Sequence, residues 1–400
     1  MRVTGNLSRT ISRARRAVFE VLEGVSTGAY ASDLLRERTR DLDRREAGLA
    51  SQVVFGCLRF QGQLDHLITR YSGRKAQDLD SAVRLALRVA IFQLRYLDRI
   101  PAHAAVHESV EYVKARKRAA AGLTNAVLRK VDRESIEWPD RATELSCPEW
   151  LLRSWERHFG TDVARRIADA ALREPTPYVR VAPGAEFSPE MKLEATDVPG
   201  AYRLLSSISP GVRLQDIGSQ ALVTLLNLES GDSYLDLCAA PGNKTLQALE
   251  TSLRLAVACD ISFKRLREVP PVCPRLVLDA AESLPFNMQF DRILVDAPCS
   301  GTGTLARNPE IKWRVTEQDF ARFQEKQRAI LSQAVSLLAP GGKIVYATCS
   351  LEREENEDVV SGVLHGHPEL VCEQEMWRVP GREEGDGFYA ARLAIRLDRR

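Results

Sequence analysis

The feature that most constrains the fold is a regular alternation of strand-like and helix-like stretches over residues 228–400. Five short apolar runs predict strands, at 234–238, 255–259, 275–278, 292–295 and 343–347. Such alternation is typical of parallel strands joined by helices that cover both faces of the sheet. We therefore predict a Rossmann-like α/β domain over residues 228–400.

Residues 1–135 show helical patterning and no strand-like alternation. Asp43 and Glu46 form a D-x-x-E helix start before an apolar series. Residues 81–97 are apolar over a broad face, and that helix is expected to end before Pro101. A last helix is predicted near 123–131. This part of the chain is therefore predicted to be an all-α domain.

Residues 136–227 contain eight prolines, a density that favours short elements and loops. We predict a linker and a small α+β subdomain here, so that the 400 residues form a multi-domain chain of three parts.

The composition, 44% hydrophobic and 28% charged, is that of a globular protein, and no apolar run is long enough for a transmembrane helix. No signal-peptide segment follows Arg2, Arg9, Arg13, Arg15 and Arg16, so we assign these arginines to the mature chain. The eight cysteines form no C-x-x-C pair, which favours a reducing compartment. We expect a cytoplasmic protein.

Positive charge is concentrated at the N-terminal end. Residues 1–135 hold 25 Lys and Arg against 15 Asp and Glu, whereas the whole chain has a net charge of only +2. This asymmetry favours a polyanionic partner that meets the first domain. The alternative, that arginine-rich helices only confer solubility, stays open from charge alone.

A tight turn after the first predicted strand indicates a nucleotide cofactor. Residues 238–245 read C-A-A-P-G-N-K-T and lead into a helix, so that backbone N–H groups can approach a ligand closely. The next three predicted strands end at Asp260, Asp279 and Asp296, at one edge of the sheet. The turn is neither G-x-G-x-x-G nor a Walker A loop, which argues against NAD and ATP. The pattern predicts an adenosine-containing cofactor.

Two cysteine motifs follow later strands and predict covalent chemistry. Cys299 lies in D-A-P-C-S-G-T-G, which begins at Asp296, and Cys349 lies in A-T-C-S. Cytosine C5 is too weak a nucleophile to take a methyl group from a sulfonium unaided. Addition of a thiolate to C6 turns C5 into an enamine carbon that can do so. Two merely buried cysteines would not explain the flanking D-A-P and S-G-T-G sequences.

Two parts of the chain resemble known families. Residues 53–60, 85–114 and 122–130 are similar to the NusB family of RNA-binding helical domains. The motifs LDLCAAPGNKT, DAPCSGTGTLARNPEIKW, ATCSLEREENEDVV and EGDGFYAARL, with the acids at 260 and 279, closely resemble the Nop/Sun family of RNA cytosine-5 methyltransferases. That second likeness covers about residues 145–400.

The resemblance implies a complete set of site residues. S-adenosylmethionine would be held by the turn and the strand-end acids, which are Cys238, Ala239, Ala240, Pro241, Gly242, Asn243, Lys244, Asp260, Asp279 and Asp296. Cys349 would be the nucleophile, and the Cys299 thiol would assist breakdown of the covalent adduct. Lys244 and Asp296 would also face the target cytosine.

The combination of the two families resembles bacterial enzymes that methylate 16S ribosomal RNA. We therefore expect this RNA as the partner, met before the small subunit is fully assembled, with no membrane and no obligate protein partner.

Three departures from the family pattern stand out. Asn243 replaces a glycine, and we expect the turn to survive because asparagine tolerates positive φ. The segment 178–182 resembles an R-V-N segment of the RNA-binding subdomain, but Ala182 stands in place of the asparagine. The stretch from Asp260 to Asp279 is short and contains Pro270 and Pro271, which predicts a truncated helix.

His103 and His107 lie four residues apart, near Glu108 and Glu111, and so could share a helix face. No H-E-x-x-H order exists, and the segment matches a structural helix of NusB-like domains, so we assign no metal.

Several alternatives stay open. A tRNA or another RNA could be the substrate in place of 16S rRNA. In a DNA-type cytosine methyltransferase, Cys299 would be the nucleophile. The chain could also be a catalytically silent RNA-binding assembly factor, although its intact cysteines argue against this.

Overall fold

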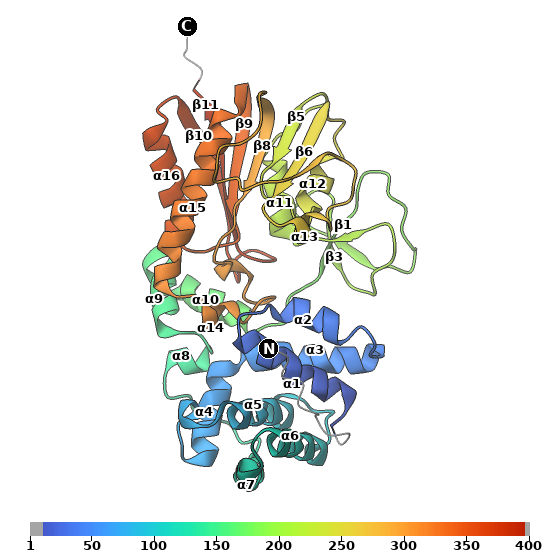
Figure 1. Ribbon diagram of the computed structural model, residues 1–400, viewed down its shortest axis with the longest axis vertical. Coiled ribbons are helices and arrows are strands. Elements are labelled where there is room, and N and C mark those ends of the chain that lie inside the picture. The colour runs from blue at the N-terminus through green and yellow to red at the C-terminus, as the bar shows by residue number, and fades with distance from the viewer. Residues whose placement is uncertain (1–10, 397–400) are drawn as a thin grey trace. The chain divides into compact units, whose positions relative to one another are not determined.

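The computed structural model describes residues 11–396, so Arg2 and Arg9 lie outside the described part of the chain. It divides into two compact units, neither of them continuous in sequence (Figure 1). Among the described residues, the helical unit comprises 11–153, Ala168–Arg173 and Ala306–Arg314, and the sheet unit comprises Ser154–Ile167, Glu174–Leu305 and 315–396. Within residues 11–396, no helix is long and apolar enough to cross a membrane.

Over residues 11–135 the helical unit is all-α, as predicted. Its main helices are α1 (Arg13–Ser26), α2 (Ala31–Arg38), α3 (Arg44–Arg59), α4 (Gln61–Ser72), α5 (Ser81–Tyr96), α6 (Ala102–Lys117) and α7 (Ala121–Leu128). Short helices are α8 (Arg141–Glu144) and α14 (Ile311–Arg314), with 3-10 turns at Ala76–Asp78 and Arg118–Ala120. The predicted start of α3 is confirmed, because the Asp43 side chain caps it by accepting a hydrogen bond from the backbone N of Glu46 at 2.8 Å.

The core of the helical unit depends on close helix packing. Phe19 of α1 stacks on Tyr112 of α6 with ring centroids 3.9 Å apart. Gly56 of α3 lies directly against Phe92 of α5, since a Cβ atom at Gly56 would fall 1.9 Å from the ring. A larger residue at position 56 would therefore require the Phe92 ring to move.

The sheet unit contains a small and a large sheet. The small one has the order β2-β3-β1-β4, and its strands are β1 (Tyr178–Arg180), β2 (Leu193–Ala195), β3 (Ala201–Leu204) and β4 (Arg213–Leu214). The large one has the order β10-β11-β9-β8-β5-β6-β7. Its strands are β5 (Ser233–Asp236), β6 (Leu255–Asp260), β7 (Arg275–Val277), β8 (Phe290–Asp296), β9 (Leu338–Thr348), β10 (Leu370–Arg378) and β11 (Phe388–Ile395).

The fold class is confirmed, with one difference in the large sheet. All five predicted strands are present, and β5, β6, β7, β8 and β9 pair in parallel. The sheet is nevertheless mixed, because β11 pairs antiparallel with both β9 and β10.

Helices cover both faces of the large sheet (Figure 1). The side chains of each strand alternate between these two faces. On one face, Tyr346 packs with residues of α15 (Glu317–Ser336) and α16 (Glu357–Gly366). On the other, its neighbour Val345 packs with α11 (Ile217–Thr224) and α12 (Asn243–Ala248).

The remaining helices are either short or divided between the two units. The predicted truncated helix is α13 (Phe263–Leu266), only four residues long. α9 (Glu149–Phe159) and α10 (Thr161–Ala171) each contribute residues to both units.

Candidate active site

The site lies where the strand order of the large sheet reverses. From β5 the chain runs outward through β6 and β7, then returns to β8 and β9 on the other side of β5. In open α/β sheets such a reversal leaves a crevice at the carboxyl ends of the two central strands. Here β5 leads into the turn 238–244, and β8 leads into the segment that carries Cys299. The topology thus brings the predicted cofactor turn and the first cysteine motif to one edge.

The cofactor turn depends on Gly242. This residue has φ of 107°, a left-handed conformation that favours glycine, and a Cβ atom there would lie 3.1 Å from Val269. Asn243 is the first residue of α12, and its Nδ2 donates to the carbonyl of Leu214 at 3.2 Å. The expectation that Asn243 would need positive φ was therefore wrong. The turn survives because Gly242 supplies the left-handed residue.

The acids at the strand ends shape this edge. Asp260 Oδ2 accepts from the backbone N of Ala240 at 3.2 Å and Oδ1 from that of Ser262 at 2.8 Å, so its buried carboxylate ties the turn to β6. Each oxygen keeps a second lone pair for a ligand hydroxyl. Asp279 is half-buried after β7, with Lys326 Nζ 3.8 Å from its Oδ2. A glycine turn beside two carboxylates suits the ribose hydroxyls of an adenosine cofactor, so these residues fit S-adenosylmethionine.

Lys244 and Asp296 form an ion pair in the crevice. Lys244 Nζ donates to Asp296 Oδ2 at 2.6 Å, and it also lies 5.7 Å from the centre of the Phe388 ring. Burial lowers the pKa of Lys244, but the Asp296 carboxylate outweighs this effect, and the net pKa lies above its usual range. The ammonium group therefore stays charged at neutral pH. The structure brings together the two residues predicted to face the substrate.

The two predicted cysteines are in contact. The Sγ atoms of Cys299 and Cys349 lie 3.3 Å apart, and both side chains are half-buried. The loops that carry these two cysteines, which follow β8 and β9, are also joined through the backbone, because Gly303 N donates to the Cys349 carbonyl at 2.9 Å. The hydrogen bond with Cys349 and burial raise the pKa of Cys299 well above its usual range. Cys299 thus keeps its proton at neutral pH and can share it with Cys349.

Two buried acids near the site were missed from the sequence. Asp236, the last residue of β5, accepts from Thr245 Oγ1 at 2.7 Å, and burial raises its pKa to about 6. It anchors the first turn of α12, directly after Lys244. Glu355 lies behind the cysteine loops and is described below. The burial of Asp236 could have been predicted from the sequence, because this acid stands between two leucines in an apolar strand.

Arg180 of the small sheet forms an ion pair with Glu250. Arg180 of β1, in the segment that resembles an RNA-binding motif, donates from its NH2 group to Glu250 Oε2 at 2.6 Å. Both side chains are only 11% exposed, so Arg180 joins the small sheet to the segment that follows α12. Ala182 lies two residues after β1 and is half-buried.

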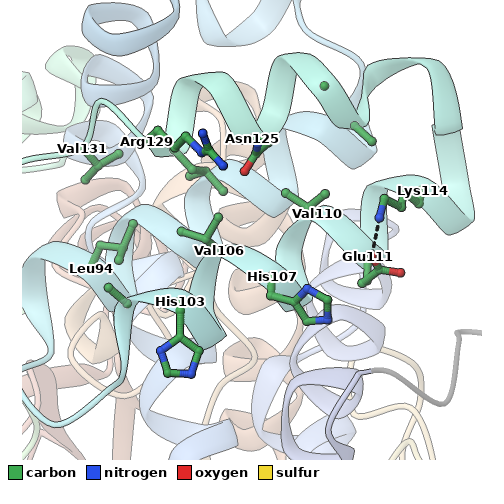
Figure 2. Close-up of a pocket in the computed structure, with 14 residues that line it drawn as sticks. Leu94, His103, Val106, His107, Val110, Glu111, Lys114, Asn125, Arg129 and Val131 are labelled. Carbon is green, nitrogen blue, oxygen red and sulfur yellow. Dashed lines mark hydrogen bonds and ion pairs between the residues drawn. The ribbon is translucent and has the colours of Figure 1, made fainter.

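The two histidines of α6 lie on the wall of a cavity of about 700 Å³ in the helical unit. Figure 2 shows both rings on the side of α6 that faces away from Asn125 and Arg129. The neighbouring acids have other partners. Glu111 pairs with Lys114 (Figure 2), and Glu108 accepts from Arg15 NH1 at 2.9 Å. Over residues 11–396, no three His, Cys, Asp or Glu side chains gather as metal ligands.

A second cavity of the helical unit, of about 1180 Å³, is rich in arginine. The arginines that line it are Arg16, Arg38, Arg84, Arg88, Arg116 and Arg314, with the acids Glu20, Glu23, Asp80 and Glu310. Several pair with acids, as Arg88 does with Asp65 at 2.7 Å. We call this set the arginine cavity.

The sheet order, the turn and acids at the reversal point and the cysteine pair define a class: a Rossmann-like methyltransferase that uses S-adenosylmethionine. Comparison with known proteins narrows this class. The family model for the 16S rRNA methyltransferase RsmB/F matches residues 223–394, and the NusB family model matches residues 12–133.

Relatives match over nearly the whole chain. Ribosomal RNA small subunit methyltransferase B of Klebsiella pneumoniae is 34% identical, over 96% of this chain and 98% of its own length. The probable ribosomal RNA small subunit methyltransferase B of Bacillus subtilis is 33% identical, over 86% of each chain. The chain belongs to the RsmB/F family of 16S rRNA methyltransferases.

Solved structures support the fold. The crystal structure of PH0851 matches with a TM-score of 0.81 at 22% identity, over 96% of this chain and 98% of that one. The structure of NSun6 from Pyrococcus horikoshii with SFG matches with a TM-score of 0.56 at 19% identity, over 63% and 99% of the two chains.

Proposed function

We propose that this methyltransferase modifies C5 of a cytosine in 16S rRNA through a covalent bond between Cys349 and C6. The observation that carries the proposal is the 3.3 Å contact of the Cys299 and Cys349 sulfurs at the carboxyl ends of β8 and β9. Methylation at cytosine C5 needs a nucleophilic thiol, which a second thiol beside it can assist, whereas methylation at an amine or hydroxyl needs no such nucleophile.

The reaction begins with the Cys349 thiolate, which adds to C6 and moves the C5–C6 π electrons onto C5 as an enamine. Bound S-adenosylmethionine supplies the electrophilic methyl group that C5 then takes. Transfer of the C5 proton to a water molecule sends its electron pair back into the ring, which re-forms the C5–C6 double bond and expels the Cys349 thiolate. The target base must leave its stack to reach this crevice.

Lys244 and Asp296 supply a charged edge for the base. The ammonium, held at 2.6 Å from the carboxylate, is fixed in orientation and stays protonated. We place this pair against the N3 and N4 edge of the cytosine, where the amino group donates to Asp296 and the ammonium stabilises charge that develops on the ring as the thiolate adds.

Cys299 is the partner thiol rather than the nucleophile. The hydrogen bond with Cys349 and burial raise the pKa of Cys299, which favours the protonated thiol beside Cys349 and so supports this role. In that position it can donate its proton to the departing Cys349 thiolate when the adduct breaks down, and solvent then re-protonates Cys299.

Single cysteine changes test the assignment. Cys349→Ser should abolish both methyl transfer and the covalent RNA adduct, since a hydroxyl is a far weaker nucleophile than a thiolate near pH 7. Cys299→Ser should still form the adduct but fail to resolve it, so protein–RNA complexes should accumulate on denaturing gels when cofactor is present. The reversed pattern, with adducts lost in Cys299→Ser and kept in Cys349→Ser, would make Cys299 the nucleophile, as in the DNA-type alternative.

The substrate assignment needs its own experiment. Bisulfite sequencing of 16S rRNA and tRNA from a deletion strain should show one lost 5-methylcytosine in 16S rRNA and none in tRNA. Naked 16S rRNA should be a better substrate in vitro than assembled small subunits. A loss confined to tRNA would contradict the 16S assignment. Calorimetry that detects no S-adenosylmethionine binding would instead favour a silent assembly factor.

We further propose that the helical unit contributes electrostatic affinity for RNA. The charge excess of residues 1–135 and the arginine cavity both support this role.

A further inference from the structure

Directly behind the two cysteine loops lies a carboxyl group that the proposed chemistry does not use. Glu355 ends the turn Arg353–Glu355 before α16, and its side chain is 0% exposed. Within residues 11–396, no Lys, Arg or His forms an ion pair with it. Burial raises the pKa of Glu355, so the position is costly for an acid, and a specific geometric role would account for its presence.

The contacts of Glu355 reach the residue that follows each cysteine. Glu355 Oε2 accepts from the backbone N of Ser300 at 2.9 Å, and Oε1 accepts from the Ser300 hydroxyl. From the other loop, Ser350 Oγ donates to Oε1 at 2.7 Å. The two hydroxyls also lie 3.1 Å apart. One carboxyl group therefore joins the Cys299 loop to the Cys349 loop.

We infer that Glu355 is a positioning residue that sets the separation of the Cys299 and Cys349 thiols by bridging the loops that carry them. Because Glu355 is fully buried and its carboxylate contacts Ser300 and Ser350, we assign it an indirect role through these two serines.

The bridge is itself fixed from a third side. Gln327 of α15 donates from Nε2 to Glu355 Oε2 at 2.9 Å and to the carbonyl of Pro298 at 3.0 Å. Gln327 is 0% exposed, so this support is as rigid as the core around it. The Tyr346 hydroxyl adds a hydrogen bond to the Glu355 carbonyl at 2.6 Å. Movement of either cysteine loop would break these buried hydrogen bonds, and a buried polar group left without a partner is costly.

The distance between the two thiols matters because both must act on the same cytosine. The nucleophile is bonded to C6 while the second thiol assists release, so a displacement of about 1 Å costs on the order of a hundredfold in rate. This consequence rests on the function proposed above, whereas the bridge itself does not.

Two substitutions distinguish the effect of losing the hydrogen bonds of Glu355 from the effect of losing its charge. Glu355→Gln removes the charge but can keep every contact, since its carbonyl can accept from Ser300 N and Gln327 while its amide donates to the two serine hydroxyls, which can rotate to accept. Glu355→Leu has a similar volume and removes charge and bridge together. Ser350→Ala is a milder change that removes only the hydroxyl arm from the Cys349 loop, and it serves if the leucine variant does not fold.

The direct readout is disulfide formation between Cys299 and Cys349, followed by mass spectrometry of the full-length protein. Diamide takes two hydrogens from the thiols and becomes a hydrazine as the S–S bond forms. Wild type and Glu355→Gln should cross-link at rates within about threefold of each other, and Glu355→Leu and Ser350→Ala at least about tenfold more slowly, because thiols held apart seldom meet. Asp291→Leu, at the opposite end of β8, is the control for loss of a partly buried acid and should cross-link like wild type.

The kinetic readout uses the same variants. Glu355→Leu should lower kcat for methylation by about a hundredfold, with KM for S-adenosylmethionine within about twofold of wild type, and Glu355→Gln should restore most of kcat. Equal cross-linking rates in Glu355→Leu and Glu355→Gln would overturn the inference. Slow cross-linking in Glu355→Leu without any adduct at Cys349 in the wild type would keep the bridge and reject only the proposed function.

Discussion

At Asp260 one carboxylate holds the turn 238–244 in place, and the same carboxylate is the one predicted to bind the cofactor ribose. Its two oxygens accept from backbone N–H groups of Ala240 and Ser262, which closes the cofactor turn against β6. The position of Asp260 at the edge of the sheet could be predicted from the sequence, because this residue ends an apolar strand. Its double backbone contact could not be predicted, since it depends on how the turn folds back over the neighbouring strand.

Asp260→Ala should weaken S-adenosylmethionine binding by at least about tenfold, since each hydrogen bond to a charged group contributes roughly 1.5–3 kcal/mol. Isothermal titration calorimetry measures this change. Asp260→Asn is the matched control, because it keeps one acceptor oxygen and should lose less affinity than alanine. Wild-type affinity in Asp260→Ala would remove this residue from the cofactor site.

At the scale of elements, the sequence predicted the parallel part of the large sheet better than the rest. The apolar runs of β5 to β9 are flanked by turns and helices, and that pattern is local. β10 carries Glu373 and Glu375 on exposed positions, and β11 is held by pairing with β9. A reversed strand inserted beside β9 is a long-range arrangement that periodicity does not reveal. Glu355 was missed for the same reason, because its serine partners lie in loops that only the folded sheet brings together.

Glu352 connects α9 to the Cys349 loop and should make the stability of the fold depend on pH. This buried acid accepts from Trp155 Nε1 at 2.9 Å and from Ser154 Oγ at 2.8 Å. Burial raises its pKa from 4.5 to about 7. Because the folded state then holds the proton more tightly than the unfolded state, stability should fall as pH rises from about 4.5 to about 7 and level off above.

The size of this effect is on the order of 3 kcal/mol, from a shift of roughly two pKa units or more at 1.36 kcal/mol each. Urea unfolding of wild type and Glu352→Gln at several pH values between 5 and 8 measures it. The glutamine variant cannot titrate at this position, so its stability should fall less steeply than that of wild type. Parallel pH profiles for the two proteins would show that Glu352 has an ordinary pKa.

At the scale of the whole molecule, the segment Ala306–Arg314 belongs to the helical unit although it follows the Cys299 motif in sequence. Its residues are held by earlier helices: Lys312 Nζ donates to the carbonyl of Arg59 at 2.9 Å, and Trp313 Nε1 donates to that of Leu58 at 2.8 Å. Lys312 is 1% exposed, and burial lowers its pKa to about 8. No local sequence pattern predicts that this segment packs in the helical unit, because Lys312 and Trp313 lie within a motif of the methyltransferase domain.

This arrangement changes how the RNA role of the helical unit should be tested. Deletion of residues 1–135 would also expose Lys312 and Trp313 to water, so weaker RNA binding could reflect misfolding. Point changes in the arginine cavity avoid this problem. Arg38 and Arg84 suit the purpose, because Arg38 is exposed and Arg84 donates only long hydrogen bonds of 3.4 Å to backbone carbonyls.

The double variant Arg38→Ala/Arg84→Ala should bind 16S rRNA more weakly and with a flatter salt dependence than wild type. If both arginines contact phosphates, the slope of log K against log salt should fall by about 1 to 2, since each phosphate contact contributes roughly 0.7–0.9. Filter binding over a range of salt concentrations measures this slope, and S-adenosylmethionine affinity should not change. Arg70→Ala, an exposed arginine of α4 outside the cavity, is the control and should keep the wild-type slope. An unchanged slope in the double variant would place the RNA contacts of the helical unit elsewhere on its surface.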